Sequence, residues 1–192
     1  QDSGSLECFD LNILSDISDH GHGVSLDLDG SQLFSGDLDG IQLHDLTAAS
    51  DGIGAGGIVG GLGASHILSC VNYGNIQGQE GVAGIVGSSR ISSGEDSEEG
   101  YSYNDIMVYN CENLGSIQGV KFVGGLVGES QCTIYSSLNS GSVRGEDYVG
   151  GIIGESPICA VQNTINQASV EGVNQVGGIV GNSIMGAITC TQ

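Results

Sequence analysis

The sequence lacks tryptophan, has a single proline and carries only three formal cations, Arg90, Lys121 and Arg144, against 23 acidic residues. Phosphate binding requires clustered lysine and arginine, so this composition excludes nucleic acid as a partner. No apolar run approaches the ~20 residues of a membrane-spanning helix, and we expect no membrane insertion. The net charge of −20 favours solubility and opposes self-association unless salt or cations screen it.

Glycine, by contrast, is abundant, with 35 positions, while 39% of the residues are apolar. A high glycine content alone is typical of low-complexity chains. Here valine, isoleucine and leucine recur at fixed places, which favours an ordered fold with many tight backbone positions.

The six cysteines form no CxxC pair and do not lie beside histidine at metal-ligand spacing. An even, scattered count with almost no lysine is typical of an exported, disulfide-bonded protein. The sequence starts at Gln1 without a signal-peptide pattern, which we interpret as a cleaved signal or a processed fragment. We therefore expect a secreted or cell-surface location.

A glycine-rich line of sequence occurs five times, and a second line follows it in step. The first line is AGGIVG at 55–60, VAGIVG at 82–87, VGGLVG at 123–128, VGGIIG at 149–154 and VGGIVG at 176–181; the second begins at Asn72, Asn113, Asn139 and Asn166. Two markers that keep one period of about 27 residues predict a solenoid.

Each repeat consists of short β-branched runs between glycine, asparagine and serine, with no helical periodicity. We therefore predict an all-β fold, a parallel β-solenoid (β-helix) with coils of about 27 residues and valine and isoleucine inside. The four asparagines should lie over one another and hydrogen-bond from coil to coil. The alternative is that asparagine only tolerates a left-handed backbone at this position.

Two segments depart from the period. Between Asn72 and Asn113 the spacing is 41, and the surplus lies in an acidic, serine-rich segment at 88–105, which we predict to be a surface loop inserted into the solenoid of residues 51–192. Residues 1–50 fit the repeat poorly, and we interpret them as irregular N-terminal coils with a partial cap.

The lines GGLVGES and GGIVGNS, with the preceding FSGDLDGIQLHDLT, resemble bacterial surface proteins with GLUG repeats over roughly residues 33–183. The resemblance implies a β-solenoid like those of large exported adhesins and of the non-catalytic parts of immunoglobulin-cleaving metalloproteases. Those enzymes carry a separate zinc domain. This sequence has no HExxH motif, so the resemblance implies no catalytic activity.

Four cysteines occupy equivalent places in neighbouring coils. Cys70 and Cys111 each precede a ladder asparagine by two residues, and Cys132 and Cys159 each follow a GES line. Strand spacing falls within the Cα window of a disulfide, so we predict the bonds Cys70–Cys111 and Cys132–Cys159.

Cys8 and Cys190 lie near opposite ends of the solenoid, too far apart for a bond within one chain unless a terminus folds back. They are either free thiols or partners between successive molecules. An uncovered solenoid end presents unpaired strand groups, and a head-to-tail contact that does not close produces a fibre.

No cofactor is predicted, apart from a calcium site at Asp27, Asp29, Asp37 and Asp39, two of the positions in each DLDG turn. The leading interpretation is a non-enzymatic, secreted subunit of an extracellular filament or scaffold, whose partners are copies of itself. The alternative is an adhesion or stalk module of a larger surface protein that binds a host or cell-surface ligand through 88–105. A carbohydrate-active β-helix enzyme is a further alternative.

Overall fold

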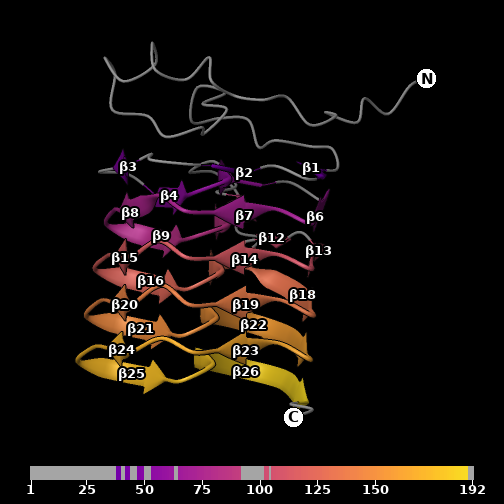
Figure 1. Ribbon diagram of the computed structural model, residues 1–192. Coiled ribbons are helices and arrows are strands. Elements are labelled where there is room, and N and C mark those ends of the chain that lie inside the picture. The colour runs from indigo at the N-terminus through magenta and orange to yellow at the C-terminus, as the bar shows by residue number, and fades with distance from the viewer. Residues whose placement is uncertain are drawn as a thin grey trace.

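A computed structural model describes residues 38–39, 42–43, 47–49, 53–62, 65–91, 102–103 and 105–189. These residues form an all-β parallel solenoid and contain no helix, which confirms the predicted fold class (Figure 1). Successive coils lie on one another, and each parallel strand pairs with the equivalent strand one coil away.

The strands belong to one 9-stranded, three 5-stranded and one 2-stranded sheet. The 9-stranded sheet holds β1 (Leu38–Asp39), β5 (Val59–Gly61), β6 (Ser65–Leu68), β10 (Val86–Ser88), β13 (Asp105–Tyr109), β17 (Val127–Glu129), β18 (Gln131–Tyr135), β22 (Ile153–Gln162) and β26 (Val180–Thr189).

The three 5-stranded sheets form the remaining walls of the coil. One holds β2 (Gln42–Leu43), β7 (Val71–Asn72), β14 (Glu112–Asn113), β19 (Leu138–Asn139) and β23 (Ile165–Asn166). The next holds β3 (Thr47–Ala49), β8 (Asn75–Gln77), β15 (Ile117–Gln118), β20 (Val143–Arg144) and β24 (Val170–Glu171). The third holds β4 (Ile53–Gly56), β9 (Glu80–Ala83), β16 (Lys121–Gly124), β21 (Asp147–Gly150) and β25 (Asn174–Gly177).

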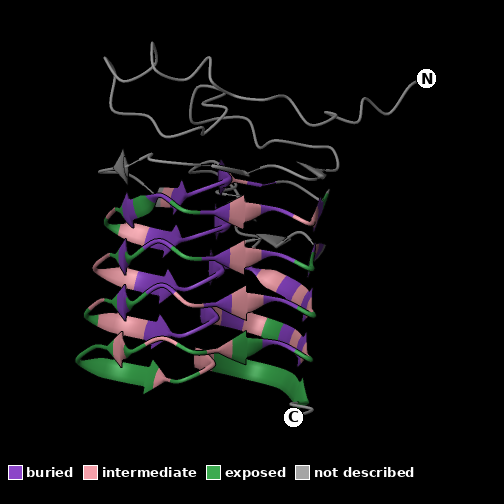
Figure 2. Cartoon of the chain, in the orientation of Figure 1, coloured by how far each residue is buried: buried purple, intermediate pink, exposed green. Residues whose placement is uncertain are grey.

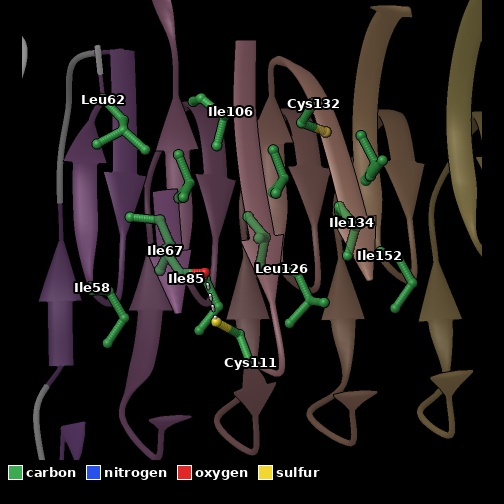
Figure 3. Packing of buried hydrophobic residues seen from close by; sticks show 14 of the residues in the cluster. Ile58, Leu62, Ile67, Ile85, Ile106, Cys111, Leu126, Cys132, Ile134 and Ile152 are labelled. Carbon is green, nitrogen blue, oxygen red and sulfur yellow. Dashed lines mark hydrogen bonds between the residues drawn. The ribbon is translucent and has the colours of Figure 1, made fainter. Parts of the chain in front are cut away.

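Apolar side chains form columns inside the coils. Ile58, Ile85, Leu126 and Ile152 are linked from coil to coil by backbone hydrogen bonds and belong to the larger of two buried clusters (Figure 3). The smaller cluster contains residues of the second and third 5-stranded sheets, among them Val123. Each fully buried aliphatic side chain contributes about 1.5–3 kcal/mol relative to an exposed one, so these columns hold the stack together.

The glycine-rich line lies where two strands of one coil approach each other. A Cβ on Gly124 of β16 would come within 3.0 Å of the Val127 carbonyl oxygen, and one on Gly128 of β17 within 3.0 Å of the Val82 nitrogen. Gly124 therefore lets β16 approach β17 of the same coil, and Gly128 lets β17 approach β9 of the preceding coil, because neither residue has a side chain. Glycine in this line therefore permits close approach of the backbone.

Two corners of the coil adopt left-handed backbone conformations. The first takes positive φ at Ser69, Asn110, Ser136 and Asn163, and the second at Gly54, Gly81, Phe122, Tyr148 and Gln175. At the second corner the later coils carry bulky residues where the earlier ones carry glycine. The rings of Phe122 and Tyr148 lie 5.1 Å apart, and Lys121 Nζ lies 4.4 Å from the Phe122 centroid. This stack offsets part of the cost of about 1–2 kcal/mol that a left-handed conformation imposes on an L-residue.

The insertion starts as a hairpin at the side of the solenoid. β11 (Arg90–Ile91) and β12 (Ser102–Tyr103) pair antiparallel, with Arg90 opposite Tyr103, and β13 then re-enters the parallel stack. The segment between these two strands, residues 92–101, lies outside the described residues.

The first described coil also follows the repeat. β1, β2 and β3 lie within the segment 1–50 and pair parallel with β6, β7 and β8. Leu43 stands at the register position of Asn72, so the asparagine ladder begins one coil later.

Candidate assembly face at the C-terminal coil

The four repeat asparagines form a continuous amide ladder. Nδ2 of Asn72 donates to Oδ1 of Asn113 at 2.8 Å, Asn113 donates to Asn139 at 2.8 Å, and Asn139 donates to Asn166 at 2.9 Å. None of the four is among the described residues with positive φ, so the left-handed alternative does not apply to them. The ladder has a direction, because each amide donates toward the C-terminal coil.

Each ladder amide also covers a glycine of the preceding glycine-rich line. A Cβ on Gly84 would lie within 3.0 Å of the Asn113 side chain, and one on Gly151 would meet that of Asn166 in the same way. Gly57 and Gly125 have the same relation to Asn72 and Asn139. The repeated GG therefore has a second role, since its second glycine makes room for the next coil's amide.

The C-terminal coil breaks this pattern because no further described coil lies on it. A Cβ on Gly178, the equivalent of Gly151, would meet nothing within 4 Å. Asn166 donates to the Ala168 carbonyl, as its counterparts do to theirs, but within the described chain it has no following asparagine. The ladder thus ends at a face that is open in the described structure.

The strands β25 and β26 are largely exposed (Figure 2), and their exposed residues include apolar side chains. Val176 is 44% exposed, whereas Val149, its register partner one coil earlier, is fully buried. The most exposed are Ile184 at 76% and Val173 at 74%. Ile188 is 50% exposed, and its register partner Val161 is likewise buried. Val176 and Ile188 thus occupy repeat positions that form the core one coil earlier, and exposed apolar groups of this kind mark interaction surfaces.

The C-terminal coil is almost free of charge. Glu171 is the one charged residue between 163 and 189, and its carboxylate lies 3.8 Å from Arg144 Nε. In register with Asp147 and Glu155 of the preceding coil stand Asn174 and Asn182. Their amides donate to these two carboxylates at 2.7 and 3.0 Å. We call the outer side of residues 163–189 the terminal face.

The predicted disulfides are absent from the structure, which corrects the expectation for Cys70–Cys111 and Cys132–Cys159. All four cysteines are buried thiols. The columns themselves are as predicted, since Cys132 and Cys159 are register partners. Parallel in-register strands lie about 4.8 Å apart and carry their side chains in the same direction, so the Cβ atoms keep nearly that spacing, beyond the roughly 3.5–4.5 Å that a disulfide requires.

The first cysteine pair occupies places that hydroxyl side chains fill in later coils. Ser137 Oγ donates to the Tyr135 carbonyl at 2.7 Å, and Thr164 Oγ1 donates to that of Gln162 at 2.9 Å. Cys111 Sγ donates to Tyr109 in the same way at 3.4 Å, and its own backbone nitrogen donates to Ser137 Oγ. These thiols therefore serve as weak donors at a corner of the coil.

Burial makes these thiols poor nucleophiles. The pKa of Cys111 is raised well above its usual range, mainly by a hydrogen bond with Cys70 and also by burial. The pKa of Cys132 is raised mainly by burial and also by electrostatic repulsion from Cys159. A raised pKa lowers the thiolate fraction at a given pH, and the thiolate is the reactive form. We expect iodoacetamide at pH 9 to label both cysteines slowly in the native protein and fully in denaturant, as measured by peptide mass spectrometry. Cysteines that stay unlabelled in denaturant until a reductant is added would show that disulfides form.

Most of the remaining predicted site residues are not described by the structure. Cys8, Cys190, Asp27, Asp29 and Asp37 lie outside the described residues, and Asp39 ends β1. Within the part of the chain that the structure describes, no three His, Cys, Asp or Glu side chains gather to hold a metal ion. The same part has no helix long and apolar enough to cross a membrane.

Comparison with solved structures finds a similar fold in a crystal structure described as "a putative immunoglobulin A1 protease from Bacteroides ovatus", with a TM-score of 0.55 and 19% sequence identity. The match covers 81% of this chain and 57% of that one, and at this identity it shows the solenoid fold alone. No protein-family model matches the sequence, and neither does any curated protein.

Proposed function

We propose that the protein is a non-enzymatic, secreted structural protein, a β-solenoid subunit that assembles head to tail with copies of itself into an extracellular filament or scaffold. The observation that carries the proposal is the terminal face, which presents the strands of the repeat, its apolar columns and its amide ladder with no described coil stacked on them. A solenoid edge of this kind is a template for strand addition.

A second copy offers a matching strand for every wall of the terminal face. The first described coil, residues 38–62, contains β1 to β5, which occupy the same columns as β26, β23, β24, β25 and again β26. Because this coil and the last one share the register of all coils between them, one could continue the other. Such a contact joins two different surfaces, so it repeats without closing and produces a fibre.

The distribution of charge also favours this contact. The chain as a whole has a net charge of −20, and two copies therefore repel each other. Glu171 is the single charged residue of the terminal face, and it already lies beside Arg144. Contact at this face therefore adds little charge repulsion. We expect association to strengthen with salt, which screens the remaining charge.

The proposal predicts that charge on the terminal face abolishes association. In the double variant Val176→Glu and Ile188→Glu, two carboxylates replace apolar side chains whose register partners Val149 and Val161 are buried in the preceding coil, so both would have to lose water when a second copy docks. We expect the sedimentation coefficient of the wild type, measured by sedimentation velocity, to rise with protein concentration. Electron microscopy of the same samples should show filaments. The variant should remain monomeric at concentrations at least tenfold higher.

Leu114→Glu supplies the matched control. Leu114 is exposed and apolar but lies two coils from the terminal face, so this variant should associate like the wild type. A wild-type chain that stays monomeric at all concentrations and salt levels would contradict the proposal. So would a control that loses association as completely as the double variant.

The hairpin of β11 and β12 favours a second candidate function, an adhesion or stalk module of a larger surface protein. This pair is antiparallel, whereas the other paired strands in the described chain are parallel. Its two strands flank an acidic stretch of the sequence, and a host or cell-surface ligand that binds to this hairpin would leave the parallel stack intact. Discrete rods in electron micrographs, in place of filaments, would favour this function.

A further inference from the structure

We infer that a second copy docks on the terminal face in register, as a direct continuation of the parallel coils, and that Gly178 is the residue that enforces this register. The inference rests on the proposed function and specifies the geometry of its contact. It follows from a comparison of Gly178 with the four glycines that hold its place in earlier coils.

In those earlier coils the glycine is covered by two groups of the next coil. A Cβ on Gly125 would lie within 3.0 Å of the Gly151 carbonyl oxygen and of the Asn139 side chain. A Cβ on Gly151 would meet the Gly178 carbonyl oxygen and the Asn166 side chain within the same distance. One of the two obstacles is therefore backbone, which cannot rotate away as a side chain can.

The same atoms define where an in-register partner must lie. Backbone hydrogen bonds continue through this column, from the Gly125 nitrogen to the Gly150 oxygen and from the Gly151 nitrogen to the Gly177 oxygen. A coil that repeats this pairing on Gly178 brings a carbonyl oxygen to the position where an alanine Cβ would project. A partner that docks only through apolar contacts, out of register, does not need that space.

Gly178 is also a position where a side chain costs the isolated chain nothing. Its φ is not positive, and a Cβ meets no atom of the described structure within 4 Å. Gly178→Ala therefore separates association from folding. We expect its melting temperature to equal that of the wild type at concentrations where both are monomeric.

The test is association of Gly178→Ala, measured by sedimentation velocity beside the wild type and the Val176→Glu, Ile188→Glu variant. In-register docking predicts that the alanine variant needs at least tenfold higher concentration to associate and forms few or no filaments. A Gly178→Ala chain that associates like the wild type, while the charged variant does not, would overturn the in-register contact and leave the end-to-end function intact. A wild type that never associates would overturn both.

Discussion

Replacing Gly125 by alanine is expected to destabilise the solenoid more than any surface substitution. The added methyl group would overlap the Gly151 carbonyl oxygen and the Asn139 amide of the next coil. Relief requires a shift of backbone in a close-packed stack, and the ladder bond from Asn139 to Asn166 would shift with it. We expect a loss of about 3–5 kcal/mol, a large share of the ~5–15 kcal/mol that stabilises a typical domain.

Thermal unfolding followed by circular dichroism measures this loss. A drop of roughly 6–20 °C in the melting temperature is expected, since about 2–4 °C corresponds to 1 kcal/mol at this chain length. Gly178→Ala is the matched control, because it makes the same chemical change at the equivalent place in the last coil, where the methyl group meets no described atom. Equal melting temperatures for the two variants would show that the next coil does not lie over Gly125.

Removal of an interior ladder amide is the second large effect. Asn113→Ala deletes the acceptor of Asn72, the donor to Asn139 and the donor to the Gly115 carbonyl, all buried. A buried polar group left without its partner costs about 1–3 kcal/mol, so a total loss of roughly 3–5 kcal/mol is expected. Urea unfolding at constant pH measures it from the shift of the midpoint at unchanged slope.

The last rung provides the control for this prediction. Asn166 is half-buried and receives one inter-coil hydrogen bond, from Asn139, so water can replace part of what Asn166→Ala removes. Its expected cost is about 1 kcal/mol, well below that of Asn113→Ala. If both substitutions cost the same, the ladder bonds would not contribute through burial and continuity.

The cysteine columns show where sequence reasoning stops. Equal spacing from the ladder asparagine placed Cys70 and Cys111 in one column, and the structure agrees with that placement. Whether stacked cysteines form a bond depends on the direction of their Cβ atoms, which repeat spacing does not contain. The later residues of this column, Ser137 and Thr164, were the signal that the position requires a small donor.

The roles of the glycines were equally hidden. Glycine can take positive φ at a corner or permit close approach of two walls, and the sequence does not assign either role to a given glycine. In the structure only Gly54 and Gly81 have positive φ among the described glycines, while bulky Phe122 and Tyr148 take the same corner in later coils. A sequence rule that reserves the left-handed region for glycine fails there, because packing of the aromatic stack compensates for the backbone cost.

The sequence by itself determined the period, the parallel stacking of equivalent residues and the order of the columns, because a repeat of about 27 residues with β-branched runs can bury its apolar side chains only on its own neighbours. The tertiary structure decided which neighbours actually meet. It placed each ladder amide on a glycine, kept the four described cysteines as thiols and left no described atom within 4 Å of a Cβ on Gly178. These outcomes depend on side-chain direction and on which atoms face each other across the coils, and periodicity carries neither.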